Sequence, residues 1–281
     1  MSNEKTLNEN VSDEKVLYEV QNNIALITLN RPKQRNAQDL DLIVQLDACW
    51  TKAAEDKDVR VIVLKANGPH FSAGHDISAE AMTQLTDVDW DNEAIADLYH
   101  YEKKHFIDFC RKWRNVPKPS ICAVQGACIA AGLMLAWPCD LIIAAENAVF
   151  SDPVVHMGIG GVEYHGHTWE LGPRKAKEML FTSSAINAEQ AEQLGMVNKV
   201  VPLESLNDEV MTMAETIAKK PPFGLALAKR AVNRTMDIMG QQNAIEAVFD
   251  IHELGHGNSM AATGQPVFVY LDGMKKAAAD K

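Results

Sequence analysis

The chain has 281 residues, of which 47% are hydrophobic, and its formal net charge is -11. This apolar content is enough to bury a substantial core, whereas the acidic balance and the absence of a large basic cluster argue against nucleic-acid binding. No apolar run reaches the roughly 18 residues that a membrane span needs. The polar, acidic start lacks the apolar core of a signal peptide, and the five cysteines form no CxxC pair. We therefore expect a cytoplasmic protein with reduced thiols.

Hydrophobic periodicity divides the chain into strands and helices. We predict strands at residues 16–20, 24–29, 59–65, 120–124, 141–144, 148–150 and 197–201. Helical spacing predicts helices at residues 39–54, 94–113, 130–136, 173–182 and 188–194, and a mostly helical chain from residue 206. The first two strands should form a hairpin, the strands at 141–144 and 148–150 should pair with each other, and residues 78–92 should form a mobile loop. The recurrence of two strands plus a helix predicts an α/β fold of stacked ββα units.

Two turns of small residues follow predicted buried strands. Residues 71–77 read FSAGHDI and residues 123–132 read AVQGACIAAG. A glycine such as Gly74 permits backbone angles that let neighbouring N–H groups point out of the sheet, and Asp76 suits the N-cap of a following helix. Outward N–H groups beside a helix N-terminus can stabilise a developing oxyanion. From either turn alone, an ordinary strand-to-helix connection is the simpler interpretation.

Taken with six further motifs in the same order, these turns resemble the crotonase (enoyl-CoA hydratase/isomerase) superfamily. The motifs are LNRP at 29–32, NA at 36–37, CDL at 139–141, FSDP at 150–153, GMVNKVVP at 195–202 and AKRA at 228–231. The resemblance runs from about residue 16 to residue 276 and implies a ββα spiral core with a helical C-terminal trimerisation part. On this basis we divide the chain into a flexible tail (1–14), the core (15–204) and the helical part (205–281).

The resemblance also implies the chemistry. Members of this superfamily stabilise a thioester enolate with two backbone N–H groups, which fall at His75 and Ala131 here. It implies an acyl-CoA substrate, no cofactor beyond the coenzyme A of that substrate, and assembly as a homotrimer or homohexamer. The residues that match the nucleotide and pantetheine path are Arg31, Ala37, Ala73, Asp76 and Ile77.

The chain departs from the hydratase pattern at both catalytic glutamates. Met134 and Val154 occupy those positions, and with Pro153 they are expected to line the acyl pocket. Because neither side chain can carry a proton, isomerase, hydrolase or lyase chemistry replaces ordinary hydration as the expectation, unless another residue activates water. A non-catalytic CoA-thioester binder is the alternative.

Residues 158–170 are the expected source of replacement acid–base groups. Glu163 lies near the acidic position of isomerase and dehalogenase relatives, and a carboxyl beside an apolar pocket should have a raised pKa. His165 and His167 are alternative proton carriers, and Asp152 and His156 flank the lost glutamate site. Glu163, His165 and His167 could equally form a polar hydrogen-bonded loop with Tyr164 and Trp169. The side chain of His75 could also enter the acyl pocket.

A competing motif, HELGH at residues 252–256, fits the HExxH pattern of zinc hydrolases. Gly255 and Gly257 are unfavourable inside a helix, and no third ligand is evident, although Asp272 or another subunit could supply one. We therefore expect no metal. A thiol nucleophile at Cys128 or Cys139 is a further alternative, but buried cysteines usually pack as small hydrophobic residues.

Overall fold

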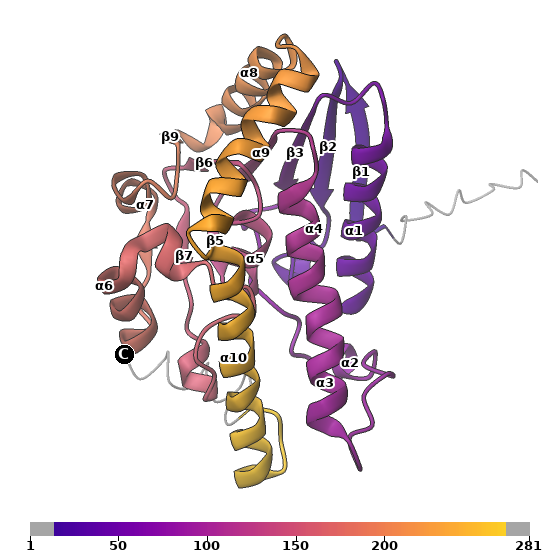
Figure 1. Ribbon diagram of the computed structural model, residues 1–281, viewed down its shortest axis with the longest axis vertical. Coiled ribbons are helices and arrows are strands. Elements are labelled where there is room, and N and C mark those ends of the chain that lie inside the picture. The colour runs from indigo at the N-terminus through magenta and orange to yellow at the C-terminus, as the bar shows by residue number, and fades with distance from the viewer. Residues whose placement is uncertain (1–13, 268–281) are drawn as a thin grey trace, which may run out of the picture.

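The computed structural model describes residues 14–267, which form two sheets surrounded by helices (Figure 1). The larger sheet has the order β1-β2-β3-β4-β6-β9, and a second sheet has the order β5-β7-β8. The strands of the larger sheet are β1 (Val16–Gln21), β2 (Ile24–Leu29), β3 (Val61–Ala66), β4 (Ser120–Val124), β6 (Leu141–Ala145) and β9 (Lys199–Val201). Those of the smaller sheet are β5 (Ala127–Ile129), β7 (Val149–Ser151) and β8 (Ile186–Asn187). The predicted hairpin is confirmed, because β1 and β2 pair antiparallel, and the rest of the larger sheet is parallel.

The helices of the first half are α1 (Leu40–Glu55), α2 (Ala79–Met82), α3 (Ala94–Glu102), α4 (Phe109–Asn115) and α5 (Ala131–Ala136). Those of the second half are α6 (His167–Thr182), α7 (Ala188–Leu194), α8 (Leu206–Ala218), α9 (Pro222–Ile238) and α10 (Gln241–Thr263). The C-terminal part is helical as predicted, and α10 lies beside α3 (Figure 1). No helix among the described residues is long and apolar enough to cross a membrane.

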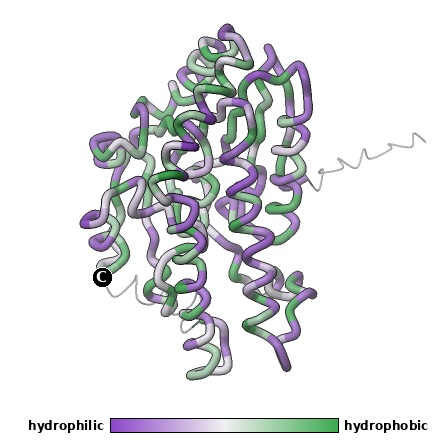
Figure 2. Tube along the Cα trace, in the orientation of Figure 1, coloured by the Kyte–Doolittle hydropathy of each residue, from purple (hydrophilic) through white to green (hydrophobic). Residues whose placement is uncertain are grey.

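Both faces of the parallel sheet are buried, as expected for strands that read as continuous apolar runs. Every residue of β2 is buried. One face packs against α1 and the central helices, and the other packs against α8, where Leu206, Val210 and Ala214 lie against Ile24 and Leu26. Each fully buried Leu or Ile contributes about 1.5–3 kcal/mol relative to exposure. In Figure 2, α3 and α4 alternate hydrophobic and hydrophilic residues, as helices that cover a core do.

Three sequence-based expectations are corrected by the structure. The strands at 141–144 and 148–150 do not pair with each other, because β6 joins the larger sheet while β7 pairs with β5 and β8. The helix predicted at 94–113 is interrupted by a π-helical turn, η2 (Lys103–Asp108). Asp76 does not cap a helix: its carboxylate accepts from the Ser78 N–H and pairs with Arg31, while the Ser78 hydroxyl accepts from the Ala81 N–H in α2.

The predicted tail at residues 1–14 and the last residues of the predicted helical part, 268–281, lie almost wholly outside the described residues. Asp272, the suggested third metal ligand, is among them.

Candidate active site

A cavity of about 690 Å³ opens beside the two glycine-containing turns. Its volume is in the range of small-molecule sites, about 300–1,000 Å³. The walls come from the turn at 71–77, the start of α5, the segment that carries α2 and α3, the loop after β7, and α10. The apolar part of the wall includes Leu85, Trp90, Leu98, Phe106, Ile129 and Val162. A mostly apolar cavity with a few buried polar groups is typical of a binding site.

Backbone hydrogen bonds hold the two turns together. Ser72 donates its N–H to the Ala127 carbonyl at 3.0 Å and accepts from the Ile129 N–H at 3.0 Å. Gly74 has φ +91, and a Cβ built on it would lie 2.9 Å from the Ile129 carbonyl oxygen and 3.3 Å from the Ala131 nitrogen. Glycine is required at this position both by the dihedral angle and by the close approach.

Two backbone N–H groups on the cavity wall have no acceptor among the described residues. The backbone on either side of His75 pairs with Gln38: the Gly74 carbonyl accepts from the Gln38 N–H, and the Asp76 N–H donates to the Gln38 carbonyl. The N–H of His75 lies between these two hydrogen bonds and takes part in neither. Ala131 is the first residue of α5, where N–H groups have no partner in the preceding turn. Both residues line the cavity. The two amides are therefore free to donate to a bound molecule.

Glu163 reaches the cavity and pairs with histidines from distant parts of the chain. Its Oε1 lies 3.1 Å from Nε2 of His75 and 3.7 Å from Nε2 of His252. Burial opposes ionisation of Glu163, but the charges of His75 and His252 outweigh it and lower the pKa of Glu163 to about 2. Burial likewise opposes the charge on His75, yet Glu163 raises its pKa. The expected raised pKa of Glu163 is thus wrong, because the carboxyl faces cations rather than only apolar groups.

Asp152 and His165, two other candidate proton carriers, are not among the residues that line the cavity. The fully buried carboxylate of Asp152 accepts from the Val162 N–H at 2.9 Å and lies 2.9 Å from Nε2 of His167. Burial, with a contribution from His167, lowers the pKa of His165 to about 3, so its ring is neutral. The Asp152 contacts hold the loop that carries Glu163 against the residue that follows β7.

Only two of the three predicted acyl-pocket residues lie on the cavity wall. Pro153 and Val154 line the cavity, whereas Met134, a residue of α5, is buried in the core and does not. His156 is exposed on the loop after β7. Val154 thus gives the cavity an apolar wall at one of the two positions where the sequence resemblance leads us to expect a glutamate in a hydratase.

All five residues of the predicted nucleotide and pantetheine path line the cavity, namely Arg31, Ala37, Ala73, Asp76 and Ile77. The Arg31 guanidinium lies 3.3 Å from the Asp39 carboxylate and 3.1 Å from the Asp76 carboxylate, so its charge is already balanced. Lys33 and Arg35 also line the cavity and carry positive charge that was missed in the sequence, where they appeared as ordinary turn residues.

Three further polar residues of the cavity wall were not predicted to meet there: Glu102, His252 and His256. The two histidines belong to the HExxH motif, which the sequence did reveal, but nothing in the sequence indicated that α10 packs against this cavity. Glu102 lies at the end of α3, and no sequence motif indicated that its side chain would belong to the site.

Comparisons with known proteins agree with this fold. The sequence profile of the enoyl-CoA hydratase/isomerase family matches residues 19–264. The chain is 43% identical over 253 residues to a Mycobacterium tuberculosis protein with the provisional name enoyl-CoA hydratase EchA13, covering 86% of this chain and 80% of that protein. It is 32% identical over 223 residues to the 1,2-epoxyphenylacetyl-CoA isomerase of Escherichia coli, covering 78% and 81%.

A crystal structure from Mycobacterium thermoresistibile, provisionally assigned as an enoyl-CoA hydratase, superposes with a TM-score of 0.85 at 57% identity and covers 90% of this chain and 99% of that one. The chain therefore belongs to the enoyl-CoA hydratase/isomerase family and is a crotonase-type enzyme.

Proposed function

We propose that this enzyme binds an acyl-CoA thioester and stabilises its enolate between the backbone N–H groups of His75 and Ala131. The observation that carries the proposal is that both amides lie on the cavity wall, on the two turns that meet at Gly74, with no acceptor among the described residues. A preorganised donor aimed at a developing oxyanion lowers the barrier by about 3–4 kcal/mol. The family membership of the chain and the isomerase relative that acts on a CoA thioester support the same substrate class.

The Glu163–His75 pair is the proposed proton carrier. The Oε2 atom of Glu163 is buried and has no hydrogen-bond partner among the described residues, so this oxygen can accept a proton from the carbon next to the thioester. His75 can in turn supply a proton to a different carbon of the same intermediate. Proton removal and return without water is an isomerisation. The apolar Val154 on the wall favours it over ordinary hydration.

Lys33 and Arg35 are proposed to attract the phosphates of coenzyme A. Both line the cavity from the η1 turn (Pro32–Gln34) and the residue after it, whereas Arg31 is occupied by Asp39 and Asp76. An acidic protein needs only such a local basic rim to bind an anionic ligand. The apolar cavity suits bulky or alicyclic acyl groups, and efficient hydration of crotonyl-CoA would contradict that part of the proposal.

Mass spectrometry of a panel of acyl-CoA and enoyl-CoA thioesters incubated in H₂18O tests the reaction class. An unlabelled isomer, absent with Glu163→Gln, is the expected result. Label in a hydrated product would show that another group activates water, and label in a free acid would show thioester hydrolysis. No change in any thioester, with CoA binding intact, would favour the non-catalytic binder.

The oligomeric state and location are further parts of the proposal. Large apolar side chains are exposed on the C-terminal helices: Phe223, Val232, Ile238, Ile251 and Leu254. A surface of this kind suits subunit contacts in a homotrimer or homohexamer, which light scattering coupled to size exclusion measures directly. All five cysteines are free, in keeping with a cytoplasmic location.

A further inference from the structure

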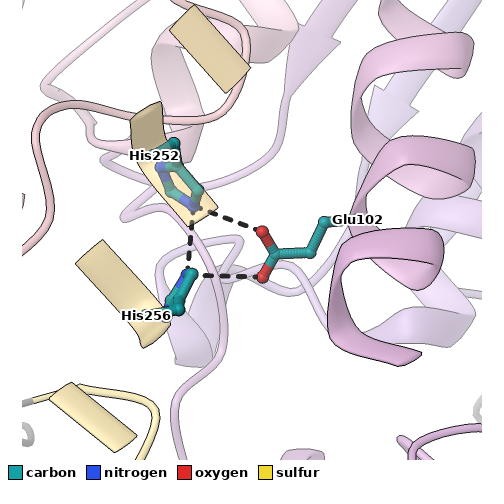
Figure 3. Close-up of side chains that lie close together, drawn as sticks. All are labelled: Glu102, His252 and His256. Carbon is teal, nitrogen blue, oxygen red and sulfur yellow. Dashed lines mark hydrogen bonds and ion pairs between the residues drawn. The ribbon is translucent and has the colours of Figure 1, made fainter. Parts of the chain in front are cut away.

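Three buried side chains from two helices converge on one point of the cavity wall (Figure 3). Nε2 of His252 lies 3.1 Å from Nε2 of His256 and 3.2 Å from Oε2 of Glu102. Nε2 of His256 lies 3.7 Å from Oε1 of Glu102. The three residues are each no more than 8% exposed. Groups of this kind are rarely brought together in a protein interior without a proton or a cation to hold them.

The backbone fixes which ring nitrogens face each other. Nδ1 of His252 lies 2.7 Å from the Gly161 carbonyl, and Nδ1 of His256 lies 2.7 Å from the Pro266 carbonyl. Because a carbonyl can only accept, each Nδ1 carries a proton, and a ring that gives up its Nε2 proton to a bound cation presents the lone pair of Nε2. In that state the two Nε2 lone pairs face one common point. Metal-binding histidines are typically held in this way, with the second nitrogen donating to a carbonyl or carboxylate.

The distances match the edges of a tetrahedral site. Nitrogen and oxygen ligands at about 2.0–2.2 Å from Zn²⁺ lie about 3.3 Å from one another. The observed separations are 3.1, 3.2 and 3.7 Å. Oε2 of Glu102 is also buried and faces Nε2 of His252, so it can serve as a ligand beside that nitrogen.

Local packing explains how the histidine pair forms. His252 and His256 are one helical turn apart on α10, which continues without a break through both glycines of this segment. A Cβ on Gly255 would lie 3.0 Å from the Gly158 carbonyl, so this glycine lets α10 approach the loop that follows β7. The glycine that argued against a helical HExxH motif in the sequence is thus what brings the motif to the cavity.

We propose that Glu102, His252 and His256 bind one first-row divalent cation, best matched by Zn²⁺, at the wall of the acyl cavity. Two imidazoles and one carboxylate favour such a cation over Mg²⁺ or Ca²⁺, which prefer oxygen ligands only. Three protein ligands leave a fourth position for water or for a bound molecule. Glu253, the glutamate of the motif, does not line the cavity, so peptidase chemistry is not part of the proposal.

The test is zinc binding by the purified full-length protein, which needs no thioester and is independent of the proposed reaction. Chelator-treated protein is titrated with ZnCl₂ in a calorimeter, and metal content after desalting is measured by mass spectrometry. We expect one Zn²⁺ per chain. Glu102→Gln and His256→Gln should each weaken binding by at least about 100-fold, while the exposed His156→Gln serves as the matched control and should leave it unchanged.

Replacement by Co²⁺ gives a second readout, because tetrahedral nitrogen and oxygen ligation produces intense visible absorption bands. Circular dichroism establishes that each variant is folded. Failure of the folded wild-type protein to retain stoichiometric metal, or equal binding by the wild type and Glu102→Gln, would overturn the proposal. The three side chains would then be a network that shares protons.

Discussion

The contact between the two turns at Gly74 can be tested by adding a single methyl group. In Gly74→Ala, the new Cβ would lie 2.9 Å from the Ile129 carbonyl oxygen, 3.2 Å from the Ala130 Cβ and 3.3 Å from the Ala131 nitrogen. None of these atoms belongs to the end of a flexible side chain, so the backbone itself must move. A non-glycine residue at φ +91 adds about 1–2 kcal/mol of strain, and overpacking adds about 1–3 kcal/mol.

We therefore expect Gly74→Ala to lower the free energy of unfolding by about 2–5 kcal/mol, measured by urea denaturation. The fraction of Gly74→Ala protein that remains folded should turn over substrate at least about 10²-fold more slowly than the wild type. The added methyl group pushes apart the two turns that carry the N–H groups of His75 and Ala131. Gly224→Ala is the matched control. Gly224 lies in α9, and the nearest neighbour of a Cβ there is 4.0 Å away, so this change should leave turnover unchanged and stability equal or slightly higher.

A Gly74→Ala protein within about 0.5 kcal/mol of the wild type, with full turnover, would refute the close approach of the turns.

Three other predictions concern proton transfer, burial and capping. Glu163→Gln should reduce turnover by about 10²-fold or more while thioester affinity changes little; unchanged turnover would remove Glu163 from the mechanism. Burial raises the pKa of Glu170 from 4.5 to about 7, so its contribution to stability is most favourable below about pH 4.5 and is lost as the pH rises toward 7. As the pH rises from 4.5 to about 7, Glu170→Gln should therefore become more stable relative to the wild type, by about 1–2 kcal/mol after allowing for partial exposure of the side chain. The measurement is the melting temperature of both proteins as a function of pH. A difference between variant and wild type that stays constant from about pH 4.5 to about pH 8 would contradict the prediction. Asn187 and Gln190 form a capping box at α7. In urea denaturation, Asn187→Ala should lower the free energy of unfolding by about 1 kcal/mol and Asn187→Asp by much less, because Asp can still accept the capping hydrogen bond. Equal losses for the two variants would argue against the cap.

The strands of the larger sheet were predictable because central strands such as β2 and β3 are largely buried and so read as nearly continuous apolar runs. The pairing of the strands at 141–144 and 148–150 was wrong because a short connection usually makes a hairpin. Here the chain instead directs the second strand, β7, to β5, where the Val149 N–H bonds to the Gly126 carbonyl. The choice between two partner sheets depends on tertiary packing, which a local pattern does not contain.

The candidate site was predictable where backbone geometry carries the chemistry and unpredictable where charge does. The turns with His75 and Ala131 could be located because glycine and small residues mark them. The ionisation of Glu163 could not, since it depends on His75 and His252, which come from distant parts of the chain. Glu102 could not be assigned either, because its position on the wall follows from the packing of α3 against α10.

The π-helical turn η2 changes the phase of the long helix that α3 and α4 would otherwise form. An α-helix rotates by about 100° per residue. One residue more or fewer in this turn would therefore rotate the side chains of α4 by about that angle relative to those of α3. Glu102, just before the turn, faces the cavity, while Cys110 and Trp113, just after it, pack into the core. A regular helix over the same span would align only one of these two sets. The π-helical turn therefore allows α3 to face the cavity and α4 to face the core within one continuous helical segment. The number of residues in the turn sets the rotation of α4 relative to α3.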